Sequence, residues 1–134
     1  MKAHLTRRYV FSASHRLHND TMTAEENRVT YGKCNNPHGH GHNYALEVTV
    51  SGRVDRRTGM VCNLTDLDKV VREQVLERFD HENLNTLEHF NSTVPTTENL
   101  CVLIYDILRR AFPAAHLEKV RLEETLMNAF SEKK

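Results

Sequence analysis

Alternating apolar and polar positions predict three β-strands in this chain. Apolar side chains occupy every second position over much of residues 3–15, again over residues 42–53, and from Leu117 to about Leu126. A period of two is typical of a strand that buries one face and exposes the other. We therefore expect a sheet with one apolar face.

Two further segments have the apolar spacing of amphipathic helices, with residues recurring three and four positions apart. The first begins near Thr65 and ends at Phe79. The second begins at residues 95–98 and ends at about Phe112, because Pro113 cannot continue a helix.

The order of these elements is strand, strand, helix, helix, strand. Strands followed by helices predict an α+β fold, here an antiparallel sheet with two helices on one face. Residues 16–39 show no period and predict a long loop, with one turn of helix at residues 24–27. A length of 134 residues is typical of one domain, so we expect residues 1–134 to form a single unit.

Composition and charge argue against two classes of partner. The 18 lysines and arginines balance the 18 aspartates and glutamates, whereas nucleic acid or an anionic membrane surface would require a basic surplus. No apolar run approaches the length of a bilayer span. Residues 1–8 carry charges with no apolar stretch behind them, which is unlike a secretory signal and indicates a cytoplasmic protein.

The spacing of histidines predicts a metal centre at one end of the sheet. His40 and His42 share the parity of the buried face of the second strand, and His15 ends the first strand on its apolar parity. If these strands are neighbours, three imidazoles converge and leave a fourth tetrahedral position open, as in catalytic zinc sites. Because all three ligands are nitrogens, iron, nickel and copper remain alternatives to zinc. The alternative is that these histidines only solvate a glycine-rich loop.

The three cysteines are expected to be reduced thiols, because their number is odd and no secretory signal is visible. Cys34 lies six residues before His40, where a metal cation would lower the thiol pKa and provide a base or nucleophile. The alternative for Cys34 is a small buried apolar residue, which is our interpretation of Cys62 and Cys101.

Three ionisable residues on later elements are further candidates. Asp80 and His81 follow the first helix and would form an acid–base relay if they face each other; a histidine at a helix C-terminus is the alternative. Glu124 shares the parity of Val120 and Leu122, so its carboxylate points to the apolar face. Two parallel N–H donors on a ligand would satisfy such a carboxylate; the alternatives are a salt bridge and a frayed strand end.

Eight stretches of the sequence, in order from about residue 8 to residue 128, resemble the 6-pyruvoyltetrahydropterin synthases of the tunnelling-fold superfamily. Together they extend over nearly the whole chain, which makes the resemblance more specific than any single motif. The stretches are Phe11–Leu17, Ala24–Asn27, Tyr31–Tyr44, Gly59–Val61, Asn63–Leu67, Phe79–Leu84, Thr96–Asn99 and Glu124–Thr125.

The resemblance implies a zinc enzyme that converts 7,8-dihydroneopterin triphosphate to 6-pyruvoyl-tetrahydropterin and releases triphosphate. The residues that match the family's site have four roles. They are the zinc ligands His15, His40 and His42, the general base Cys34 with the relay Asp80 and His81, the pterin anchor Glu124, and the pterin-pocket residues Thr97 and Glu98. Arg16 and Lys33 are candidates for holding phosphate, with exposed cations as the alternative.

The resemblance also implies an assembly. Sheets of the family pair into trimeric barrels, and two trimers stack into a homohexamer with sites between subunits. In that arrangement the relay residues Asp80 and His81 come from a neighbouring subunit.

Two overlapping His-Gly-His frames leave the product open. Five residues separate Cys34 from the frame His40–His42, as in the pyruvoyl-forming branch. Three separate it from the frame His38–His40, as in the 6-carboxytetrahydropterin synthases of the queuosine pathway, which use the same substrate. The residues that flank the first frame favour the pyruvoyl branch. The alternative to either enzyme is a protein of the same fold that binds a pterin without catalysing a reaction.

Overall fold

Two long strands form the centre of the sheet and define the position of the site. β1 (Lys2–His15) and β2 (His40–Arg53) pair antiparallel, from Lys2 opposite Arg53 to His15 opposite His40. The computed structural model describes residues 2–112, 115–124 and 128–134. Both strands coincide with predicted segments, because the alternation of side chains there matches one buried and one open face.

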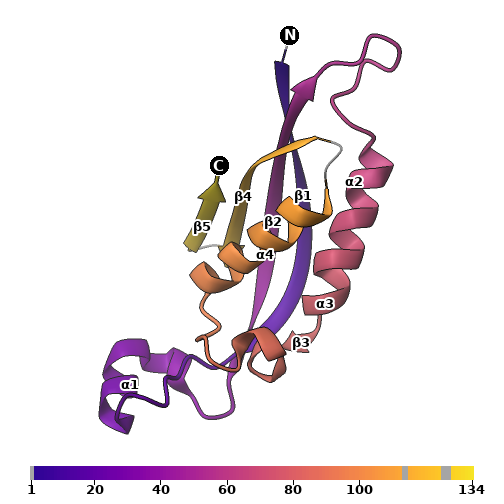
Figure 1. Cartoon of the computed structure of the whole chain (residues 1–134). Helices are drawn as coiled ribbons and strands as arrows, with labels where there is room; N and C mark the ends of the chain where they lie inside the picture. The colour runs from indigo at the N-terminus through magenta and orange to yellow at the C-terminus, as the bar shows by residue number, and fades with distance from the viewer. Residues whose placement is uncertain (1, 113–114, 125–127) are drawn as a thin grey trace.

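Three shorter strands complete the sheet in the order β3-β1-β2-β4-β5 (Figure 1). β4 (His116–Glu124) pairs antiparallel with β2, and β5 (Asn128–Lys133) pairs antiparallel with β4. β3 (Glu82–Asn83) runs parallel to β1. The predicted α+β class is confirmed, but β3 makes the sheet mixed at this edge, where an entirely antiparallel sheet was expected.

The C-terminal end of the sheet differs from the prediction. β4 ends at Glu124, and residues 125–126 of the predicted strand lie outside the described residues. β5 was not predicted, because Phe130 is its one apolar side chain packed against the core. Edge strands of this polar kind are common, since charged residues discourage further strand pairing.

Helices cover one face of the sheet (Figure 1). After β2 the chain forms α2 (Leu64–Val71), a π-helical turn η2 (Arg72–Leu76) and α3 (Glu77–Phe79), and α4 (Thr97–Ala111) precedes β4. The two predicted helices therefore exist. None of the helices in the described ranges is long and apolar enough to cross a membrane.

Short elements lie at the end of the sheet where β1 ends and β2 begins. α1 (Ala24–Tyr31) and η1 (Gly32–Asn35) connect these strands, and α1 projects beyond the sheet (Figure 1). A capping box at Thr23 and Glu26 extends the predicted turn into eight helical residues. η3 (Leu84–Thr86) and η4 (Glu88–Phe90) lie between β3 and α4.

The core lies between the helices and the apolar face of the sheet. Its most buried residues lie on the predicted parity of the strands and on the inward faces of the helices. They include Leu46, Val48, Val50, Val120, Leu122, Leu67, Val71, Leu100 and Ile104. Burying an aliphatic side chain of this size stabilises the fold by about 1.5–3 kcal/mol. This packing holds the ends of β1, β2 and β4 in register at the site.

Candidate functional site

Three histidines meet where β1 ends and β2 begins. The register places His15 opposite His40, and His42 lies two residues further on the same face. One ring nitrogen from each histidine lies within 4.8 Å of the corresponding nitrogens of both other histidines. Ring centroids are 4.8 Å apart for His15 and His40, and 4.5 Å apart for His40 and His42. The structure thus brings together the histidines that strand parity selected.

The buried ring nitrogens fit a metal ion. His15 is 1% exposed, and its Nδ1 lies 2.8 Å from the carbonyl oxygen of Pro95. That contact fixes the proton on Nδ1 and leaves the lone pair of Nε2 for a ligand. Within the described part of the chain, His15 Nε2 and His40 Nδ1 have no hydrogen-bond partner. Buried nitrogens without partners are costly, and a coordinated cation would satisfy them.

Burial also keeps these rings neutral. Desolvation is the largest influence on both His15 and His40, and it lowers the pKa of each imidazole below its usual value. A neutral imidazole has the lone pair that a metal requires. The site is therefore compatible with a metal ion, whose identity three nitrogen ligands do not decide.

Cys34 lies beside the histidine cluster. It is half-buried in η1 and lines the same cavity, of about 890 Å³, as His40 and His42. Burial first, and the negative charge of Glu124 second, raise the pKa of the Cys34 thiol. Cys101 is instead a core residue as expected, and burial raises the pKa of its thiol to about 11. Cys62 is half-buried against the core.

A carboxylate at the end of β4 joins the cluster from the other side. Glu124 pairs in register with Tyr44, and its Oε1 lies 3.7 Å from His42 Nε2. The buried hydroxyl of Thr97, at the start of α4, donates a hydrogen bond to Glu124 Oε2. Glu98 follows Thr97 on the exposed side of α4, and nothing in the described residues brings it to the cluster.

The dipeptide Asp80–His81 does not belong to the histidine cluster, although His81 and His42 line one hollow. His81 Nδ1 is 3.0 Å from Asp80 Oδ1, so the two side chains do face each other. Asp80 Oδ1 also accepts the backbone N–H of Ser12 at 2.9 Å. His81 has a φ of 62°, and it lines a hollow with Ser12 and Asn43, which lie on the outward face of β1 and β2. Within one chain, no described ion pair or hydrogen bond joins this pair to Cys34.

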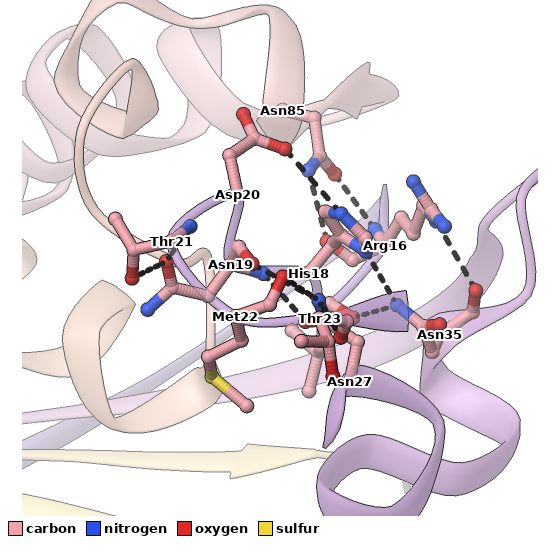
Figure 2. A network of polar contacts seen from close by, with 11 residues as sticks. Arg16, His18, Asn19, Asp20, Thr21, Met22, Thr23, Asn27, Asn35 and Asn85 are labelled. Carbon is pink, nitrogen blue, oxygen red and sulfur yellow. Dashed lines mark hydrogen bonds and ion pairs between the residues drawn. The ribbon is translucent and has the colours of Figure 1, made fainter. Parts of the chain in front are cut away.

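The loop before Cys34 is held by buried amides, which sequence patterns did not identify (Figure 2). Asn27 is fully buried, accepts the Asn19 N–H at 2.7 Å and donates to three backbone carbonyl oxygens. Asn35 donates to the Leu17 carbonyl at 2.8 Å, and Leu17 N–H donates to the Cys34 carbonyl at 2.8 Å. These contacts set the position of Cys34. The only signal in the sequence for these amide contacts was the presence of several asparagines in a segment without a period.

The loop also positions the remaining sequence candidates. Arg16 is half-buried, whereas Lys33 and His38 are exposed. Arg16 and Lys33 line the cavity with Cys34. His38 lies outside the three-histidine cluster, and its backbone N–H donates to Asn36 Oδ1 at 3.1 Å. Tyr44, 1% exposed between His42 and Glu124, was predicted only as a strand residue.

The chain is similar along nearly its whole length to proteins of one family. The family model described as 6-pyruvoyl tetrahydropterin synthase matches residues 4–134. The 6-pyruvoyl tetrahydrobiopterin synthase of Poecilia reticulata is 50% identical over 126 residues, which are 93% of this chain and 86% of that protein. The corresponding Homo sapiens protein is 48% identical over 125 residues, 92% of this chain and 86% of that one.

A solved structure agrees with the sequence comparison. The 6-pyruvoyl tetrahydropterin synthase of Caenorhabditis elegans superposes with a TM-score of 0.94 at 40% identity, over 100% of this chain and 96% of that chain. The match extends through β1, β2 and β4, whose ends carry the histidines and Glu124. Sequence and structure agree that the chain belongs to the 6-pyruvoyl tetrahydropterin synthase family.

Proposed function

We propose that this chain converts 7,8-dihydroneopterin triphosphate to 6-pyruvoyl-tetrahydropterin and inorganic triphosphate. The observation that carries the proposal is the meeting of three histidines, one buried and two half-buried, with a cysteine and a carboxylate at one end of the sheet. Membership of the family supports the same reaction. The enzyme would be a carbon–oxygen lyase, because triphosphate leaves from a side-chain carbon.

His15, His40 and His42 would hold the metal ion, for which we propose zinc. Three imidazoles leave one coordination position for the substrate, as catalytic zinc sites do. The Pro95 carbonyl keeps the His15 ring in the orientation and tautomer that a ligand needs. When bound, the ion supplies Lewis acidity that makes the C–H beside a coordinated hydroxyl easier to deprotonate.

Glu124 would bind the pterin ring. The 2-amino and N3 edge of a pterin presents two parallel N–H donors, which match a carboxylate as a guanidinium does. The Thr97 hydroxyl holds one carboxylate oxygen and so fixes the orientation of Glu124. Because His42 contacts the same carboxylate, a ring held there places its side chain beside the histidines.

Cys34 would move the protons. A thiolate beside the cluster can take the proton from the side-chain carbon attached to the ring, while the ring imine accepts the electron pair and a proton on nitrogen. Transfer of the hydroxyl proton of that carbon to the ring carbon completes the first ketone. Loss of the next C–H proton then expels triphosphate and leaves an enol, whose hydroxyl proton moves to the terminal carbon to give the diketone. The ring gains the two electrons that the side chain loses, so no external oxidant or reductant is needed.

Asp80 and His81 would supply a second proton-transfer group from a neighbouring subunit. The pair is hydrogen-bonded, and the His81 side chain is 83% exposed in the single chain. An exposed relay is available to the site of another copy. The resemblance to the family implies six subunits, so we propose a homohexamer with sites between subunits.

The histidine geometry favours the pyruvoyl product over the carboxy product. His40 and His42 belong to the cluster, whereas His38 lies outside it. The frame that reaches the metal position is therefore the one with five residues after Cys34. A pterin-binding protein without activity would have no use for a thiol at this position.

The test is incubation of zinc-loaded protein with 7,8-dihydroneopterin triphosphate, followed by mass spectrometry of the products. We expect 6-pyruvoyl-tetrahydropterin and free triphosphate. A carboxy product with released acetaldehyde would support the alternative reaction. If metal-replete protein binds the pterin but does not convert it, the chain is a pterin-binding protein and the proposed activity is wrong.

A further inference from the structure

The cavity beside the histidine cluster continues over the loop that follows β1. Its eleven lining residues include His40, His42 and Cys34 at one end and residues of α1 and η1 beyond them. Three of the eleven are cations, namely Arg16, Arg28 and Lys33, and no described lining residue is acidic. The chain has a formal net charge of zero, so this concentration of positive charge is local.

Arg16 lines this cavity. Hydrogen bonds hold it in place (Figure 2). The Asn85 side-chain amide binds the Arg16 backbone on both sides, accepting its N–H at 2.7 Å and donating to its carbonyl at 2.9 Å. Arg16 Nε donates to the Asn35 carbonyl oxygen at 3.1 Å. The guanidinium is thereby oriented from one edge, and its two terminal amino groups have no described partner.

Within the described residues, no carboxylate balances the charge of Arg16. Over the described ranges of the chain, no carboxylate oxygen comes within the 4.0 Å of an ion pair with Arg16 or Lys33. A half-buried guanidinium is normally paired, because removing a charge from water without a partner is costly. An anionic ligand in the cavity would provide that partner.

Arg28 is the cation that sequence reasoning did not select. It lies in the last turn of α1 and forms an exposed ion pair with Glu25, one turn earlier. Exposed pairs of this kind contribute little to stability. A ligand with several negative charges can therefore compete with Glu25 for the guanidinium.

We infer that Arg16, Arg28 and Lys33 form a subsite for the phosphate chain of the substrate. The inference rests on the proposed function for the identity of that chain. Arginine binds phosphoryl oxygens in bidentate fashion, and lysine adds a point charge. The reacting carbons of the substrate lie between its ring and its phosphates. A ring bound by Glu124 and phosphates bound by these cations would hold the carbons beside the histidines.

The experiment uses the full chain and its variants Arg16→Gln, Arg28→Gln and Lys33→Gln. Arg110→Gln is the matched control, because Arg110 is exposed at the far end of α4 from Thr97. The probes are inorganic triphosphate and phosphate-free 7,8-dihydroneopterin, measured by calorimetry. Thermal unfolding of each variant establishes that it is folded.

Loss of one charge-assisted contact should raise the Kd for triphosphate about tenfold in Arg16→Gln, and roughly three- to tenfold for the two exposed cations. KM for the triphosphate substrate should rise in parallel. The Kd for dihydroneopterin should stay unchanged in all variants, and Arg110→Gln should bind both probes as the parent protein does.

Unchanged triphosphate affinity in the three variants, or an equal loss in Arg110→Gln, overturns the subsite. Failure of the proposed function has a different result, namely no binding of dihydroneopterin by the parent protein. If triphosphate then still binds and Arg16→Gln still weakens it, the anion subsite stands without the pterin reaction.

Discussion

At the scale of single residues, the site depends on how buried polar atoms are satisfied. His15 uses Nδ1 for a carbonyl oxygen and keeps Nε2 for a ligand, and burial holds its imidazole neutral by lowering its pKa. The pKa of the Cys34 thiol shifts in the opposite direction, because burial and the charge of Glu124 raise it. A cation at the histidines would lower that pKa again, so metal binding and thiolate formation should be coupled.

Replacement of Cys34 by alanine tests this role. We expect Cys34→Ala to lower kcat by about 10²–10⁴-fold, the usual contribution of one positioned acid or base, with zinc content and pterin affinity retained. Cys62→Ala is the matched control, because it removes a half-buried thiol that does not line the cavity. Steady-state kinetics and metal analysis measure the outcome; equal loss of turnover and binding would mean that the thiol is structural.

The role of Glu124 belongs to the same scale. Glu124→Gln keeps the shape of the side chain but replaces one acceptor by a donor, so two parallel N–H groups no longer find two acceptors. We expect pterin affinity to fall about tenfold or more, by calorimetry with dihydroneopterin. Glu88→Gln, an exposed residue of η4, should have no effect. Unchanged affinity in Glu124→Gln would reject the anchor.

At the scale of elements, one carboxylate ties α2 to β1. Asp68 accepts hydrogen bonds from Arg7 Nε at 3.1 Å and Nη2 at 3.0 Å, and from the Tyr9 hydroxyl at 2.7 Å. The bond to Arg7 first, and the bond to Tyr9 second, lower the pKa of Asp68 below its usual 3.8. This contact lies outside the site, yet it fastens the covering helices to the strand that carries His15.

The shift of Asp68 predicts an acid dependence of stability. Because the carboxyl binds a proton less readily in the folded state, its stabilising contribution is present above pH 3.8 and is lost as the pH falls below it. Urea unfolding of metal-free protein between about pH 5 and pH 3 measures this slope. Asp68→Asn should reduce the slope, and Asp66→Asn on the same helix should keep it. Identical slopes for Asp68→Asn and the parent protein would contradict the prediction.

At the scale of the whole molecule, the proposed catalytic groups lie on two faces of one sheet. The histidines and Glu124 are on the face covered by helices, whereas Asp80 binds the backbone of β1 and His81 lines a hollow with Ser12 and Asn43 on the outward side. A site that uses all of them must combine surfaces of different copies. For the 15.5 kDa chain, the resemblance to the family predicts a light-scattering mass near six subunits, and a mass near one would exclude a shared site.

Mixing two inactive variants tests the shared site directly. Cys34→Ala and His81→Ala should each be inactive alone. When they are co-expressed, some sites should combine an intact Cys34 from one chain with an intact His81 from another, and activity should return. If both residues of a site came from the same chain, every site would keep one defect. Absence of recovery in mixed oligomers would thus refute the arrangement.

Much of the fold and the site was predictable because the relevant patterns are local. Strand parity selected His15, His40 and His42, and it also placed Glu124 on the face where it lies. The parallel strand β3 and the edge strand β5 were not predictable, because their short or polar sequences have no period of their own. The side chain of Asn27 was missed for a related reason, since its partners are backbone atoms of an aperiodic loop.

The sequence alone determined the class of fold, the histidine set and the family resemblance, because each depends on residue type and on spacing along the chain. Tertiary structure decided which charges share a cavity. Arg28 and Lys33 belong to the successive elements α1 and η1, so their proximity is local. Arg16 follows β1 and is bound by Asn85, and only the packing of these segments brings it to the same cavity. Such proximity depends on packing between distant segments, which no local period encodes.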